Sequence, residues 1–243
     1  MRFTLSSTAL SSKLFALAKV ISNKNSLPIL ADFMFRTEGN TLFITASDSE
    51  NSMTTTIELS DSDIDDSFAI ENHSLLEAVK SFPEQPLTFE ADKNDKIVKI
   101  IYQNGQFSLP IESADVYPVA AKIADIAVSI QLSSALLSEN ISRCLCATAQ
   151  DELRPVMNGV FFDITPEYLT IVSTDGHKLV RNRIYDIKND VAASLILAKK
   201  PATILKNMLA KDDTLVTITF DNRNAEVTFG DTRLLCRLID GRY

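Results

Sequence analysis

Glycine, histidine and cysteine are scarce in this chain of 243 residues, and each shortage excludes a class of site. The six glycines form neither a GxGxxG nor a GxxxxGK[ST] loop, so a dinucleotide or triphosphate loop is excluded. The two histidines belong to no HExxH motif and no GxSxG motif occurs, so we expect no catalytic, metal or cofactor site. Three cysteines without CxxC spacing indicate a reducing cytosol, and therefore a cytoplasmic protein. No apolar run approaches the roughly 20 residues that cross a membrane.

Acidic residues are concentrated between Asp48 and Glu71, a segment with eight Asp or Glu and no Lys or Arg. The net charge of the chain is −8, so the remainder is neutral and the total charge identifies no partner. Two groups of lysines lie in stretches without acid: Lys13, Lys19 and Lys24, and Lys199, Lys200, Lys206 and Lys211. Such groups are either solvated faces or a surface for phosphates. Basic and aromatic residues do not alternate, so any nucleic-acid contact would be with the backbone.

An internal repeat runs through the chain at an offset of 127 residues. RFTLSSTAL resembles SIQLSSALL, LPILADFMF resembles RPVMNGVFF, and TLFITASD resembles YLTIVSTD. Ten identities share this register: Leu5/Leu132, Ser6/Ser133, Ser7/Ser134, Leu10/Leu137, Pro28/Pro155, Phe35/Phe162, Leu42/Leu169, Ile44/Ile171, Asp48/Asp175 and Ile57/Ile184. The repeat predicts two copies of one domain, joined near residues 118–127.

Each copy has the same predicted elements. A short strand is followed by a helix, whose apolar stripe in the first copy is Leu10, Leu14, Leu17 and Ile21. Alternating strands such as TLFITAS and YLTIVST come next, and then a second helix, HSLLEAVKSF or KPATILKNMLA. Strands joined by tight turns end each copy. Consecutive strands with few helices predict an α+β fold with antiparallel sheets.

The stretch STDGHKLV, residues 173–180, is where the two copies differ most informatively. Asp175 matches Asp48, and an Asp-Gly pair between strands is typical of a turn. His177, Lys178 and Leu179 have no counterpart in the first copy, and a binding surface is the simplest explanation. Catalysis by His177 would need a nucleophile or metal ligands, and His73 is the only other histidine.

Several separated motifs resemble one family. MRFTL, SLPILADFMF, SADVYP, VMNGVFF, STDGHKL and RLIDGRY occur in the order and spacing of the bacterial sliding clamp, the β subunit of DNA polymerase III. The resemblance implies tandem DNA-clamp (processivity-fold) domains, each with two helices packed on antiparallel sheets. Domain 1 would span residues 1–120 and domain 2 residues 128–243, with the connector at 118–127. The family's third clamp domain is absent from this chain, which we therefore interpret as a fragment.

The resemblance also implies two sets of site residues. DNA backbone contacts fall on Lys24, Gln150, Arg154, Lys199 and Lys200. A pocket for partner peptides falls on Met157, Thr174, Gly176, His177, Lys178 and Leu179. Lys178 and Met157 stand where better-known members have arginine and leucine. Asn72 and His73 are the first-copy counterparts of Lys199 and Lys200, and this departure argues against DNA contact there.

The family's members are non-catalytic accessory subunits without cofactors, and they form head-to-tail homodimeric rings around duplex DNA. Their partners are double-stranded DNA, the replicative polymerase, the clamp loader, and other polymerases and repair proteins that carry short linear motifs. A chain without the third domain is expected to be a monomer. The alternatives are a two-domain protein-interaction module without a DNA role and, third, an enzyme that uses His177.

Overall fold

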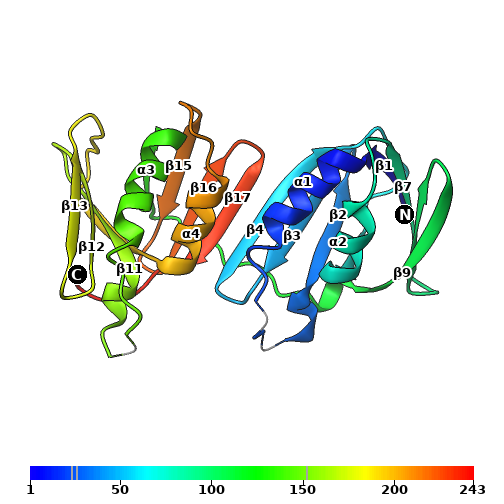
Figure 1. The fold of residues 1–243 in the computed structure, drawn as a ribbon, viewed down its shortest axis with the longest axis horizontal. Helices are drawn as coiled ribbons and strands as arrows, with labels where there is room; N and C mark the ends of the chain where they lie inside the picture. Colours follow the sequence, from blue (N-terminus) through cyan, green and yellow to red (C-terminus); the bar gives the residue numbers. More distant parts are fainter. Residues whose placement is uncertain (23, 26, 152) are drawn as a thin grey trace. The chain divides into compact units, whose positions relative to one another are not determined.

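The computed structural model describes residues 1–22, 24–25, 27–151 and 153–243. The chain divides into two compact units, Met1–Val119 (unit 1) and Ala120–Tyr243 (unit 2). Both units have the predicted α+β fold, in which two helices pack together on antiparallel strands (Figure 1). None of the helices described is both long enough and apolar enough to cross a membrane.

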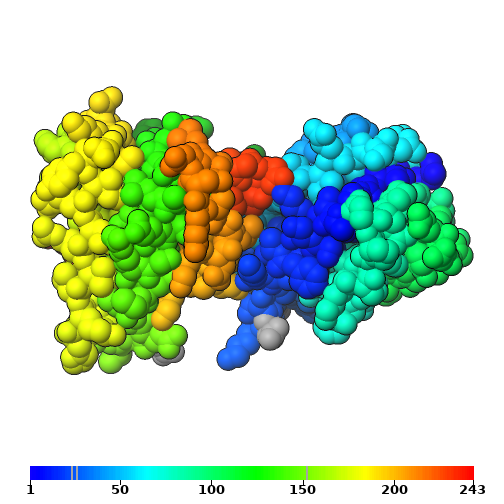
Figure 2. Space-filling model, turned by 45° about the horizontal axis from the view of Figure 1, so that its top comes forward, coloured from blue at the N-terminus to red at the C-terminus, as the bar shows by residue number. Residues whose placement is uncertain are grey.

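Unit 1 contains one antiparallel arrangement of strands in the order β4-β3-β2-β6-β9-β8-β7-β1-β5. Helices α1 and α2 lie side by side, and the space-filling view shows α1 in dark blue at the surface beside α2 in turquoise (Figure 2). In chain order the elements are β1 (Arg2–Ser6), α1 (Ser7–Leu17), η1 (Pro28–Ala31), β2 (Asp32–Glu38), β3 (Thr41–Ser47), β4 (Asn51–Glu58), β5 (Asp61–Ser62), β6 (Ser67–Glu71), α2 (Asn72–Lys80), β7 (Pro86–Asp92), β8 (Ile97–Tyr102), β9 (Gly105–Ser113) and η2 (Ala114–Val116).

Unit 2 repeats this plan with two sets of strands, β10-β15-β16-β17 and β13-β12-β11-β14. A single antiparallel bridge, Leu197 to Leu238, joins them at the position where Ile70 pairs with Ile111 in unit 1. The elements are β10 (Val128–Ser133), α3 (Ser134–Leu145), η3 (Pro155–Asn158), β11 (Gly159–Ile164), β12 (Leu169–Thr174), β13 (Leu179–Ile184), β14 (Ala193–Ala198), α4 (Lys199–Met208), β15 (Leu215–Phe220), β16 (Asn224–Phe229) and β17 (Thr232–Arg237).

The repeated Leu-Ser-Ser triplet has the same physical role in both units. Its leucine is buried, at 1% exposure in unit 1 and 2% in unit 2. The first serine is the helix N-cap, whose hydroxyl accepts a hydrogen bond from the N–H three residues later, at 3.2 Å in α1 and 3.3 Å in α3. The second serine donates to the carbonyl oxygen of Pro83 or Ala210, at 2.7 Å in each case. These interactions explain why the triplet is repeated.

The apolar stripe predicted for the first helix is confirmed over Leu10, Leu14 and Leu17, all of which are fully buried. The prediction was wrong for Ile21, because α1 ends at Leu17. Beyond it the backbone tightens into a turn in which Lys19 donates to Ala16 at 3.3 Å, which takes the chain off the helical register. The same alignment predicted Cys144 as a core residue, and it is fully buried.

Candidate peptide-binding turn and nucleic-acid interface

The turn at residues 175–178 is organised by the side chain of Asp175. Its Oδ1 accepts hydrogen bonds from the N–H of His177 at 2.9 Å and of Lys178 at 2.7 Å. These donors, that of Lys178 first, lower the pKa of Asp175 to about 2, so the carboxylate is ionised at neutral pH. Gly176 has φ of +86°, a conformation that glycine adopts without strain. His177 contributes its backbone, and its side chain is exposed.

The turn is fastened to the C-terminal end of α3. The ammonium of Lys178 lies 3.3 Å from Asp175 Oδ2 and donates to the carbonyl oxygen of Cys146 at 3.2 Å. Ser173 donates its hydroxyl to the carbonyl oxygen of Cys144 at 2.6 Å. A cation beside the last carbonyls of a helix is favourable because of the partial negative charge there. The charge of Lys178 is therefore used within the chain.

Arg154 lies against the same turn. A Cβ atom added to Gly176 would lie 3.0 Å from Arg154 Nη1, so the guanidinium occupies the space that a side chain would need. Arg154 Nε donates to Asp151 Oδ2 at 2.8 Å. Asp151 is itself held by Asn158, since each backbone group of Asp151 pairs with the Asn158 amide at 2.9 Å. This loop aims the guanidinium at the turn, an arrangement that the sequence motif did not reveal.

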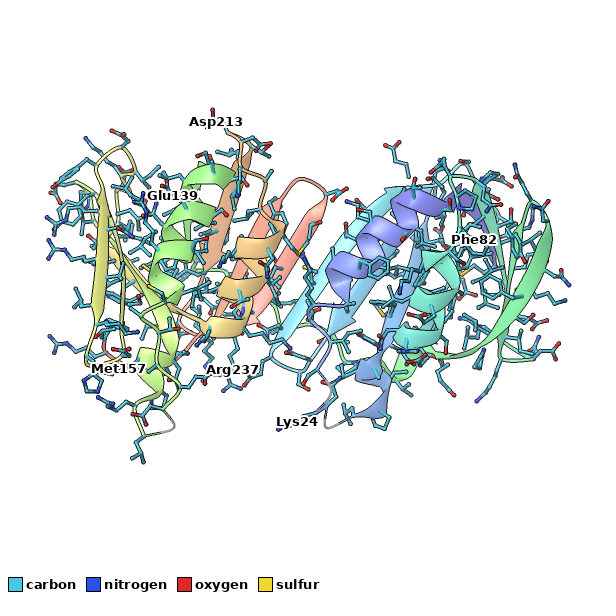
Figure 3. The ribbon with its side chains drawn as sticks, in the orientation of Figure 1. Lys24, Phe82, Glu139, Met157, Asp213 and Arg237 are labelled. Carbon is cyan, nitrogen blue, oxygen red and sulfur yellow. The ribbon has the colours of Figure 1, made fainter. Side chains whose placement is uncertain are left out.

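Apolar side chains flank the turn. Leu179, the first residue of β13, is 67% exposed, although leucine is usually buried. Met157 is half-buried in η3, three residues after Arg154, and is labelled in Figure 3. Tyr243 stacks on Phe161 with ring centroids 4.9 Å apart. The alignment of Tyr243 with Tyr117 was the only sequence signal for this contact.

The residues predicted to contact DNA do not form one cluster. Lys24 is exposed in the loop between α1 and η1 of unit 1 (Figure 3), and Gln150 is exposed between α3 and η3 of unit 2. Lys199 and Lys200 are the first two residues of α4. Arg154 is engaged by Asp151 beside Gly176, as described above.

The N-terminus of α4 is electrostatically unusual. Ala198 at the N-cap position provides no side-chain hydrogen bond, and no acid lies in the first turn. Two lysines therefore stand where the helix dipole is positive, which disfavours cations. In unit 1, the Glu71 carboxylate caps α2 and accepts from the N–H of His73 at 3.0 Å and of Ser74 at 2.6 Å. The uncapped N–H groups of α4 and its lysines together form a surface suited to an anion.

Charge is distributed unequally between the helices and the rest of the chain. The four helices contain six Lys or Arg against two Asp or Glu, a net +4. Since the whole chain has −8, everything outside the helices has −12. The two helical acids are paired, Glu77 with Lys80 at 3.8 Å and Glu139 with Arg143. The helices therefore form the most cationic part of an acidic protein.

Two duplicated α+β units, with helices of positive charge and one specialised turn, define the class of tandem DNA-clamp domains. Residues 1–121 match the family model of the DNA polymerase III beta subunit, N-terminal domain, and residues 131–243 match that of its central domain. The chain belongs to the DNA polymerase III beta subunit family.

Curated and solved relatives agree. The chain is 24% identical over 245 residues to the beta sliding clamp of Pseudomonas putida and 25% identical over 251 residues to that of Bacillus subtilis. Both comparisons cover 100% of this chain and 66% of the relative, so the chain spans just under two thirds of their length. The crystal structure of the DNA polymerase sliding clamp from Bacillus subtilis has a TM-score of 0.92 at 25% identity, again covering 100% and 66%. The subunit beta structure from Pseudomonas aeruginosa has a TM-score of 0.91 at 24% identity.

Proposed function

We propose that this chain is part of a DNA-sliding clamp, a non-catalytic processivity factor that encircles duplex DNA and tethers a replicative polymerase and other partners. The observation that carries the DNA role is the N-terminus of α4, where two lysines and uncapped N–H groups lie together without an acid. Such a site attracts phosphate through charge and through N–H donors, and it reads no base sequence. Membership of the family supports the same role.

We propose that partner peptides bind at the turn of residues 174–179 and beside Met157. The exposed Leu179 side chain is a suitable anchor for an apolar peptide residue. Thr174 and Gly176 form the floor, because the Thr174 hydroxyl donates to the Lys178 carbonyl at 2.7 Å and receives the Gly176 N–H at 3.1 Å. We assign Arg154 to the rim of this pocket rather than to the DNA backbone, since its guanidinium lies at Gly176.

The domain limits remain a proposal: domain 1 at residues 1–120, the connector at 118–127 and domain 2 at 128–243. In the complete protein, a third clamp domain would follow, and two chains would close head to tail into a ring. Lacking that domain, this chain should be monomeric, because a heterologous contact needs both of its surfaces. Light scattering coupled to size-exclusion chromatography checks this, and a dimer that resists dilution would contradict the proposed ring.

A second candidate, a protein-interaction module without a DNA role, is favoured by one observation. The cations Lys80 and Arg143 on α2 and α3 have acidic partners and are available only in part to phosphate.

A double variant of α4 separates the two candidates. Lys199→Glu together with Lys200→Glu should weaken binding of short duplex DNA at low salt by more than tenfold and should leave peptide binding unchanged. It should also flatten the dependence of affinity on salt, because the slope is about −0.9 per phosphate contact. If the folded double variant binds duplex DNA as wild type does, the interaction-module candidate is preferred.

A further inference from the structure

Phe15 is an aromatic residue that the packing of unit 1 does not use. It lies on α1 with 43% of its surface exposed, whereas the stripe Leu10, Leu14 and Leu17 on the same helix is fully buried. Among the residues described, it is the only aromatic on an α-helix in the exposed class. The corresponding position of α3 in unit 2 is Ser142, so the duplicated fold itself does not require an aromatic residue here.

The residues around Phe15 on the helix surface are neutral or cationic. Ser12 precedes it by three residues and Lys19 follows it by four, and both are exposed, so the three share one face. Helix α1 contains no Asp or Glu. The Glu84 carboxylate is held at the first turn by the hydroxyls of Ser6 and Thr8, about 10 Å along the axis from Phe15. The face therefore combines an apolar ring with a cation in an acid-free surface.

This combination distinguishes the kind of partner. A protein surface that docks by apolar contact usually presents a patch of several large side chains, and Phe15 is flanked by serine and lysine instead. The four helices have a net charge of +4 in a chain of −8, which selects a polyanion. In duplex DNA the accessible apolar groups beside the phosphates are the deoxyribose edges, since the bases are stacked.

We propose that Phe15 contacts the deoxyribose edges of a DNA duplex lying along α1, with Lys19 reaching the adjacent phosphate. The inference rests on the proposed DNA role and adds a contact that is not ionic. A lysine contact releases counterions and weakens as salt rises, whereas an apolar contact does not. Because a ring against sugar has no fixed hydrogen-bond geometry, this contact is compatible with movement of the duplex along the helix.

Salt dependence tests the proposal on the chain itself. Phe15→Ser introduces the residue found at the equivalent position of α3, and it should lower duplex affinity three- to tenfold without changing the slope of log affinity against log salt. Lys19→Gln should reduce that slope by about one. Tyr185→Ser, which removes an aromatic residue that is 63% exposed in unit 2, is the matched control and should change neither quantity. Thermal unfolding confirms that each variant is folded.

Fluorescence gives a second readout that does not depend on lost affinity. The chain contains no tryptophan, so Phe15→Trp and Tyr185→Trp each provide a single reporter. Duplex DNA should quench and shift the emission of the Phe15→Trp variant and leave that of Tyr185→Trp unchanged. If wild type and the lysine variants behave as expected but Phe15→Ser binds normally and Phe15→Trp is silent, the inference on Phe15 is overturned and the DNA role stands. If wild type binds no duplex even at low salt, both are overturned.

Discussion

The turns at residues 48–51 and 175–178 have the same backbone and opposite surroundings. In unit 1, Asp48 Oδ1 accepts from the N–H groups of Glu50 at 3.1 Å and Asn51 at 2.7 Å, as Asp175 does in unit 2. Ser49 has φ of +80° and Gly176 +86°. The residues that follow the aspartate differ at every position, so one carboxylate is enough to specify the turn in both copies.

What differs is how the surface beside each turn is covered. In unit 1, Leu30 is fully buried and packs with Ala69 and Tyr117, which is 5% exposed. In unit 2 the equivalent of Leu30 is Met157, which is only half-buried. Unit 1 therefore seals with its own side chains the region that unit 2 leaves accessible. Duplication retained the scaffold, and the side chains around the turn decide whether a partner can bind.

The largest expected effect comes from removing the apolar anchor of unit 2. Leu179→Ala should weaken a clamp-binding peptide by about 2 kcal/mol, roughly 30-fold, because truncating a buried anchor forfeits its contact area. Folding should change by no more than about 0.5 kcal/mol, since the side chain is exposed in the free chain. Isothermal titration checks the affinity, with Val191→Ala as an exposed aliphatic control. Equal losses in both variants would contradict a specific anchor.

The second prediction concerns the start of β2, where Asp32 occupies the position of Gly159 in unit 2. Burial, and then the carboxylates of Glu71 and Glu112, raise the pKa of Asp32 from 3.8 to about 6. Because the folded-state pKa exceeds the unfolded value, ionisation opposes folding. The associated stability is complete below about pH 4 and is lost as the pH rises through 6.

Asp32→Asn removes this loss. The variant should be more stable than wild type by about 2 kcal/mol at pH 7.5 and no more stable at pH 4. Urea unfolding at the two pH values measures the difference, with the exposed Asp213→Asn as control. A gain of the same size at both pH values would contradict the role of ionisation.

The third prediction compares the ends of α4. Lys199→Glu should stabilise unit 2 by about 0.5 kcal/mol, since an acid at a helix N-terminus favours the dipole, while weakening duplex binding. Lys206→Glu, in the last turn, should destabilise by a similar amount for the same reason. Opposite shifts in denaturant midpoint are the expected result. Two shifts of the same sign would show that local contacts, and not the dipole, determine stability here.

The smallest expected effect is a reciprocal exchange in the two turns. Ser49→Gly should stabilise unit 1 by about 0.5 kcal/mol, because glycine relieves the strain of a positive φ. Gly176→Ser should destabilise unit 2 by a comparable amount and should also weaken peptide binding, since its Cβ would meet Arg154 Nη1. Chemical denaturation and peptide titration measure both. A Gly176→Ser variant with unchanged peptide affinity would remove Arg154 from the proposed pocket.

Local patterns predicted much of the scaffold. The offset of 127 residues, the buried stripe of α1 and the core position of Cys144 depend on neighbours along the chain or on the repeat itself. Ile21 was misassigned because a periodic pattern does not state where a helix loses its hydrogen bonds. The DNA and peptide-binding roles of individual residues stay predictions, as they came from the family resemblance.

By itself, the sequence determined the duplicated α+β plan, the N-cap serines and the Asp-Gly turn, because each arises from interactions within a few residues or from one repeated pattern. Only the tertiary structure decided that Arg154 lies over Gly176, that Lys178 is tied to the end of α3, and that Phe15 is left exposed. The first two join residues 22 and 32 positions apart, and the third depends on which helix face the sheet covers. Such proximities follow from how strands and helices pack, and no local pattern encodes them.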